Sequence, residues 1–304
     1  MSEQKSALLV LLGVAMLWGF SYVVSAFLLH SFSPILLSFS KMCLTWLFML
    51  SVLVKTGKQR WPTRKEWLII LLSSIFGTLI QQPLYFIGLQ YSTAANASLI
   101  YAVAPLAAII LERIFLKVRL TGIKLLGGFL GFLGVLVIVS SGGASFRISM
   151  GDLLLLAAML GMTISMLFTP LLAKSMSSVS IYFYSGPVGV LLMAPLAGGE
   201  ALTGQIKASG DTLVIVLLIV LGMTTALSGV WWTQGVAVAG PGKAAMFMNI
   251  PPFISLIAGH FILGEPIYTA QLLGGVLVLA GVYITNSRRR GQGVPPVSEE
   301  SLIS

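Results

Sequence analysis

A basic residue lies inside an apolar run of the sequence. Lys41 is seven residues beyond Pro34, where that run begins, so in a helix it lies roughly 10 Å from the end of the run. If the run crosses a bilayer, a cation at this depth is costly and indicates a functional residue that binds an anionic or zwitterionic ligand. The structural alternative is that the long side chain reaches back to the interface or caps carbonyl groups of a neighbouring helix.

Three further ionisable residues lie near the ends of apolar runs. His260 can carry a proton at physiological pH, although a lone histidine near a helix end more often has a structural role. Glu112 directly precedes Arg113, and Glu265 directly precedes Pro266. We expect both carboxylates at an interface rather than in a reactive cluster.

The sequence lacks the usual combinations of catalytic side chains. It has two histidines, His30 and His260, and no glycine-rich loop followed by Lys and Ser or Thr. The single cysteine, Cys43, excludes an intramolecular disulfide and a cysteine-based metal cluster. We therefore predict that the chain is not an enzyme and that it has no catalytic residue, no metal site and no cofactor.

The composition indicates a lipid environment. Of the 304 residues, 57% are hydrophobic and 9% are charged, and the mean hydropathy is +0.98, so too little polar surface remains to cover a water-soluble core. The net charge of +9 does not indicate nucleic-acid binding, because the basic residues lie between apolar runs and not on a soluble domain. The lipid bilayer is the expected surrounding partner.

Ten apolar runs have the length of a membrane-spanning helix. The sequence thus predicts an all-α integral membrane protein with ten transmembrane helices. The runs are 6–28, 34–54, 67–89, 95–115, 121–140, 151–172, 178–197, 214–236, 243–262 and 267–286.

Lysine and arginine in the connections predict the orientation. With the N-terminus in the cytoplasm, fifteen of these residues fall on the cytoplasmic side and two, Arg147 and Lys207, fall outside. Both termini are then cytoplasmic. The stretch 288–304, which begins with three arginines, is expected to be a disordered cytoplasmic tail.

An internal duplication relates the two halves of the chain. A shift of 147 positions lays the segment 85–137 on 232–284 without a gap and keeps glycine and proline in register. We predict a first repeat over 1–142 and a second over 150–287, each with five helices. Because five is odd, the second repeat enters the membrane upside down, which is the inverted-repeat architecture of secondary transporters. The matched pairs include Gly88 with Gly235, Ala97 with Ala244, Pro105 with Pro252, and Gly127-Gly128 with Gly274-Gly275.

Several motifs, in this order along nearly the whole chain, resemble the EamA-like branch of the drug/metabolite transporter superfamily. They are Trp18-Gly19-Phe20, Pro34 with Lys41, the segment 89–98 (LQYSTAANAS), Pro105 and the segment 263–267 (LGEPI). The resemblance implies a ten-helix transporter that exports amino acids or similar small metabolites across the plasma membrane. Val118 stands where the family pattern often has Glu, so a symmetric pair of acids is not expected.

The mechanism of such a transporter stays partly open. No carboxylate lies near the middle of an apolar run, which disfavours proton coupling through a buried acid; uniport, exchange or coupling through His260 are the alternatives. Import or export, and the oligomeric state, are not determined by the sequence, and a monomer is compatible with it. A carrier of a quaternary amine or a lipid-like substrate is the alternative function, favoured by the aromatic residues. An intramembrane enzyme is less compatible.

Two related helix faces predict the substrate site. Gly77, Gln81, Tyr85 and Gly88 share one face by their spacing, and the 147-residue shift carries them onto Thr224, Ser228, Trp232 and Gly235. A cavity between inverted repeats needs such polar walls, whereas a helix-packing seam is the alternative. The predicted substrate-binding residues are Trp18, Gln81, Tyr85, Tyr101, Trp232 and Asn249, with Lys41 at the outer side.

Overall fold

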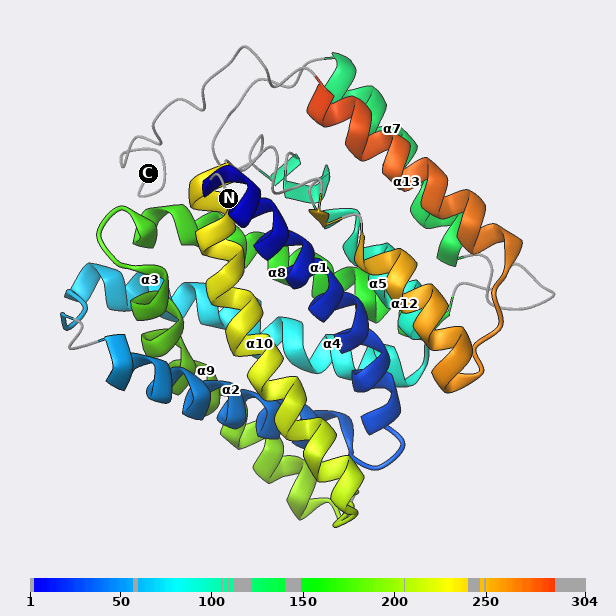
Figure 1. The fold of residues 1–304 in the computed structure, drawn as a ribbon. Coiled ribbons are helices and arrows are strands. Elements are labelled where there is room, and N and C mark those ends of the chain that lie inside the picture. Colours follow the sequence, from blue (N-terminus) through cyan, green and yellow to red (C-terminus); the bar gives the residue numbers. More distant parts are fainter. Residues whose placement is uncertain are drawn as a thin grey trace.

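The computed structural model describes residues 3–56, 60–104, 106–108, 110–111, 122–139, 149–204, 206–239, 247–248 and 250–287. The regular secondary structure in these ranges consists of helices, with no strand (Figure 1). The all-α prediction is confirmed for this part of the chain. The tail 288–304 and the predicted site residue Asn249 lie outside the described residues.

Within the described residues, six helical segments are long and apolar enough to cross a membrane, so the chain is a multi-pass membrane protein. Shorter apolar helices lie beside them. The limits of α1, α2, α7 and α8 lie close to those of the predicted apolar runs, whereas α5 ends before its predicted limit and α12 begins after its own. The six are α1 (Glu3–Leu28), α2 (Pro34–Thr56), the continuous α3 (Arg64–Ser74), η1 (Ile75–Ile80) and α4 (Gln81–Gln90), α8 (Met150–Ala173), α9 (Ser178–Leu202) and α10 (Thr212–Ala239). The others are α5 (Ala94–Tyr101), α7 (Gly122–Val139), α12 (Pro251–Ala258) with η2 (Gly259–Leu263), and α13 (Thr269–Ser287).

A wide turn interrupts the third predicted run. The segment η1 is a π-helix between α3 and α4, where the sequence predicts a single regular helix. Pro83 follows it and has no N–H to donate to the carbonyl group of Leu79, so a regular helix is disfavoured there. The wide turn rotates the residues that follow, Gln81 and Gln82 first.

The helices that face the predicted site come from both halves of the chain. In Figure 1, α1 lies against α10 and α12, α2 lies against α9 and α10, and α4 lies against α8. The main hydrophobic core joins residues of α1, α4, α5, α8 and α10. Helices distant in sequence therefore enclose a common interior.

Helices α7 and α13 run side by side at one edge of the molecule (Figure 1). A Cβ atom on Gly134 would lie 2.6 Å from the carbonyl oxygen of Gly274, and one on Gly281 would lie 2.5 Å from that of Gly127. These glycines therefore allow the two helices to pack closely. Gly128 has no atom within 4 Å of its added Cβ atom, so it is not part of the contact.

Candidate functional site

Two tryptophans predicted for the site meet between α1 and α10. The ring centroids of Trp18 and Trp232 are 5.1 Å apart, and the planes are tilted by 42°. The indole N–H of Trp18 donates to Oγ of Ser228 at 3.1 Å. A residue of the first half thus contacts two residues of the second half.

A second aromatic group joins α1, α4 and α5. The rings of Tyr85 and Tyr101 are 5.7 Å apart, and Tyr22 lies 6.1 Å from the first and 6.0 Å from the second. Nε2 of Gln81 donates to the hydroxyl group of Tyr101 at 2.8 Å. Tyr22 was not predicted, although its spacing of four residues from Trp18 places both on one face of α1. That face connects the tyrosines with the tryptophan pair.

Lys41, on α2, contacts residues of the neighbouring helix α4. Its Nζ atom donates to Oε1 of Gln82 at 2.9 Å and lies 5.0 Å from the ring centre of Phe86. The residue is only 9% exposed. Among the described residues the structure shows a salt bridge between Arg60 and Glu66 but none to Lys41. The ammonium group therefore has a neutral acceptor and a ring as partners, and no carboxylate.

The tyrosine group and the lysine are contiguous through α4. The rings of Tyr85 and Phe86 are 4.9 Å apart, so the residue that contacts Lys41 also contacts the tyrosine group. Four of the predicted substrate-binding residues, Lys41, Gln81, Tyr85 and Tyr101, thus belong to one connected set of side chains. Trp18 and Trp232 form a second group, which shares a face of α1 with Tyr22. Asn249 lies outside the described residues.

These side chains fill the space between the helices. Gln81, Tyr85 and Tyr101 are each buried and contact one another directly. A ligand could enter only if they moved apart. The helix α5 ends at Tyr101 and a turn follows, so this part of the group lies at a break in a membrane helix. Pro105 has no N–H to donate to the carbonyl group of Tyr101.

The glycines of the predicted cavity face have a different role. An added Cβ atom on Gly77 would clash with the side chain of Ser165, and one on Gly88 would lie 2.9 Å from the carbonyl oxygen of Gly151. Both glycines therefore allow α8 to approach closely. The predicted face is in part a packing seam, while Gln81 reaches from it to Tyr101.

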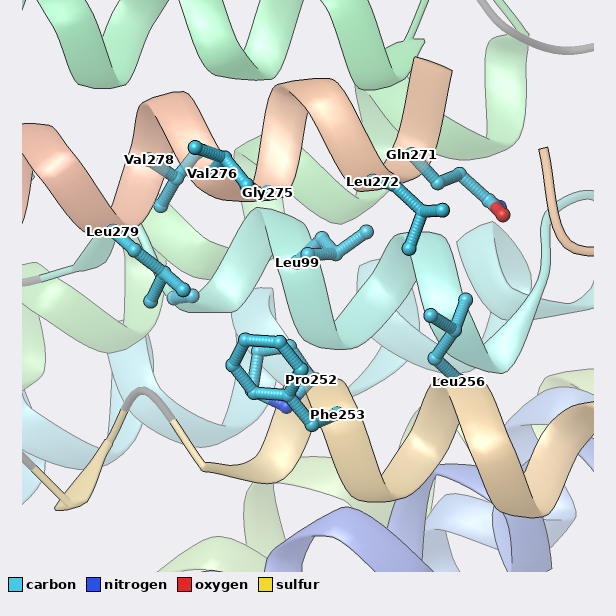
Figure 2. Close-up of a pocket in the computed structure, with 11 residues that line it drawn as sticks. Leu99, Pro252, Phe253, Leu256, Gln271, Leu272, Gly275, Val276, Val278 and Leu279 are labelled. Atoms are coloured by element: carbon cyan, nitrogen blue, oxygen red, sulfur yellow. The ribbon is translucent and has the colours of Figure 1, made fainter. Parts of the chain in front are cut away.

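A pocket lies between α5, α12 and α13, away from the predicted residues (Figure 2). Leu99, Phe253, Leu272 and Val276 are among its lining side chains, and Gln271 is the polar residue at one end. Such a surface offers apolar contact and little directional binding. It does not resemble a site for a charged metabolite.

The carboxylate of Glu265 caps the N-terminus of α5. Glu265 accepts from the amide of Ala94 at 2.9 Å and from that of Ala95 at 3.4 Å, at the start of α5. Burial raises the pKa of Glu265 above its usual range, while these two amides act in the opposite direction. Nδ1 of His260 lies 2.9 Å from the backbone oxygen of Glu265. The structural role expected for His260 matches its contact.

Comparisons with known proteins agree with this architecture. The EamA-like transporter family matches residues 5–140 and 149–287. "Uncharacterized transporter YyaM" of Bacillus subtilis (strain 168) is 28% identical over 90% of this chain and 91% of its own. An "Uncharacterized transporter" of Archaeoglobus fulgidus is 24% identical over 90% of this chain and 95% of its own. "Probable terminal-alkyne amino-acid exporter" of Streptantibioticus cattleyicolor is 27% identical over 77% of each chain.

A solved crystal structure shares the fold. It aligns with 92% of this chain and 98% of its own with a TM-score of 0.63, at 15% sequence identity. The family match covers nearly the whole sequence, and the resemblance seen in the sequence motifs is confirmed. The chain belongs to the EamA-like transporter family.

Proposed function

We propose that this transporter exports amino acids or similar small metabolites across the plasma membrane by alternating access. The proposed site lies between the two aromatic groups that include Trp18, Gln81, Tyr85, Tyr101 and Trp232, with Lys41 beside it and Asn249 as a further lining residue. No cofactor takes part. The chain acts on a small-molecule substrate and not on nucleic acid.

Lys41 carries this proposal. A buried ammonium group with one neutral acceptor retains unused donors for a carboxylate. In a medium that excludes water, a charge-assisted hydrogen bond of this kind is strong. The aromatic rings beyond Phe86 would contact the apolar part of the same molecule, and a ring face attracts an ammonium group. A zwitterionic amino acid could therefore place its carboxylate on Lys41 and its ammonium group on a ring face.

The architecture proposed for transport is the inverted repeat. Two five-helix halves, 1–142 and 150–287, form ten transmembrane helices with both termini in the cytoplasm. The separate matches of the family to 5–140 and 149–287 support this arrangement. The break after Tyr101 and the turn at Met248, shortly before α12, support a binding region at discontinuous helices. Rocking of the halves would open the set of side chains to either side.

A quaternary amine is the second candidate substrate. Five aromatic side chains meet around one face of α1, and such groups bind a cation without a hydrogen-bond donor. Lys41 distinguishes the two substrates, because its charge attracts a carboxylate and repels a cation. The "amino-acid exporter" in the name of the relative from Streptantibioticus cattleyicolor supports the first substrate.

Reconstitution tests the proposal. Purified protein in liposomes would be loaded with labelled phenylalanine, alanine or choline, or prepared with a fluorescent phospholipid. We expect efflux of an amino acid, with no cleavage products by mass spectrometry. Efflux of choline alone, or movement of the phospholipid alone, would instead support a carrier of a quaternary amine or of a lipid-like substrate. Chemical conversion of any compound would contradict a transporter without enzymatic activity.

A further inference from the structure

A carboxyl group that the proposed function does not use lies in the first turn of α8. Asp152 is 1% exposed. Its Oδ1 atom accepts hydrogen bonds from Oγ of Ser92 and, at 3.2 Å, from Nδ2 of Asn96. Its Oδ2 atom has no hydrogen-bond partner. A buried charge on an unpaired oxygen is costly, whereas a neutral carboxyl group leaves no charge unpaired.

The hydrogen bonds of Asp152 join three helices at one end of the molecule. Oδ1 of Asn96, on α5, accepts from Nε2 of Gln271 at 2.7 Å, and Gln271 belongs to α13. Asp152 thus links the start of α8 to the starts of α5 and α13. In the proposed orientation this is the outer end.

Backbone contacts close the same end tightly. Oγ of Ser149, just before α8, donates to the carbonyl oxygen of Tyr91, just after α4, at 2.9 Å. A Cβ atom on Gly151 would lie 2.5 Å from that oxygen and 2.6 Å from the carbonyl oxygen of Gly88. Water can therefore reach Oδ2 only when α8 separates from the connection between α4 and α5.

Among the described residues, few other groups near this end can titrate. Beside the first turn of α8 the candidates are Tyr91 and Glu265, and both oxygens of Glu265 accept backbone hydrogen bonds. No described lysine or arginine forms a salt bridge with Asp152. On the helices that pack against α8, the titratable side chains are those of 64–66 on α3, at the opposite end, Tyr85 on α4, Tyr101 on α5, and Tyr182, Tyr184 and Glu200 on α9.

We propose that Asp152 is a proton-binding site that controls the opening of the outer end. The protonated side chain fits the closed arrangement, and the proton leaves to external water as α8 separates from α4 and α5. It returns from that water when the end closes. A higher external pH therefore favours the open arrangement. The inference rests on the proposed alternating access and orientation, because it concerns the opening of one end.

Cysteine labelling from the external side tests the inference without any substrate. The reporter is Leu155→Cys in a Cys43→Ala background, because Leu155 is 0% exposed and lies on the same face of α8 as Asp152. Labelling by a membrane-impermeant maleimide is normalised to Ala208→Cys, an exposed position, to remove the pH dependence of thiol reactivity. We expect the normalised rate to rise by about tenfold per pH unit below the midpoint, as one ionising group predicts.

Three variants assign that pH dependence. Asp152→Asn keeps an oxygen for Ser92 and Asn96 but has no proton to lose, so labelling should stay low at every pH. Glu265→Gln is the matched control, and should leave the pH dependence unchanged. Ser92→Ala removes a hydrogen bond to Oδ1 that exists only in the closed arrangement, so it should favour opening and move the midpoint to lower pH. This last variant keeps the test decisive if Asp152→Asn does not fold.

Each contrary result overturns the inference. These results are constant labelling of the parent at all pH values, an unchanged pH dependence in Asp152→Asn, its loss in Glu265→Gln, or an unshifted midpoint in Ser92→Ala. The outcome is separable from the substrate proposal. Liposomes that move no amino acid, together with labelling that follows Asp152, would refute the substrate alone, and transport with constant labelling would refute the proton site alone.

Discussion

The ammonium group of Lys41 lies 5.0 Å from the centre of the Phe86 ring, inside the helical bundle. The ring belongs to α4 and directly follows Tyr85 in sequence, so a cation on α2 is in contact with the aromatic group of α1, α4 and α5. A movement of α2 relative to α4 would change the environment of both. The lysine is thus placed to respond to a ligand held by the aromatic rings.

Replacing Lys41 with Met tests its role in binding. Loss of a charge-assisted hydrogen bond should weaken amino-acid binding by about tenfold to a hundredfold in calorimetry. The melting temperature should stay within a few degrees of the parent, since removing a buried charge also removes its desolvation cost. Lys207→Met, at an exposed position of the segment 206–211, is the control for net charge. A structural anchor would instead lose folded protein, and normal binding by Lys41→Met would exclude the lysine from the site.

The positions of the helices could be predicted from hydropathy because lipid requires long apolar runs with internal hydrogen bonds. Both ends of α2 and of α7 lie within two residues of the predicted limits. The π-helix before Gln81 was not predicted, since hydropathy is insensitive to how many residues form one turn. Its cause, Pro83, is visible in the sequence, but a proline can also kink or end a helix.

The side-chain contacts of the site were less predictable. Spacing places Gln81 and Tyr85 on one face, but not which neighbouring helix each side chain reaches. Gly77 and Gly88, on that same face, pack against α8 instead of lining a cavity. Asp152 was overlooked because it lies at the start of its run, where a carboxylate is ordinarily solvated; only the packing of α4 and α5 buries it.

Removing an aromatic side chain of the proposed site should weaken substrate binding, whereas removing an exposed one on α13 should not. Tyr85→Leu and Trp232→Leu each remove a ring that contacts a ring of another helix. We expect each to reduce amino-acid affinity by about tenfold or more, because aromatic rings in contact contribute beyond their buried area. Tyr283→Leu, at a position 67% exposed on α13, is the matched control. Parental affinity in both site variants would assign these rings to helix packing.

The proposed orientation has a direct test in intact cells. Single cysteines at Gly57 and Ser304, in the Cys43→Ala background, should be protected from a membrane-impermeant thiol reagent, because positive charge keeps those connections in the cytoplasm. Cysteines at Ser31 and Ala208 should react. Permeabilised cells provide the control, where all four should be labelled. Strong external labelling at Gly57 would contradict the charge distribution and, with it, the inversion of the second repeat.

The crossing of α7 and α13 should depend on Gly281 and not on Gly128, which lies outside the contact. A Cβ atom on Gly281 would lie 2.5 Å from the carbonyl oxygen of Gly127 and 2.8 Å from the amide nitrogen of Gly131. Both are backbone atoms and cannot rotate away, so Gly281→Ala must push the helices apart. We expect a loss of about 1–3 kcal/mol, measured as a lower melting temperature in detergent. Gly128→Ala meets no atom within 4 Å and should be neutral or slightly stabilising, because alanine favours the helix. If the two variants melt at the same temperature, the close approach of the two helices does not contribute to stability.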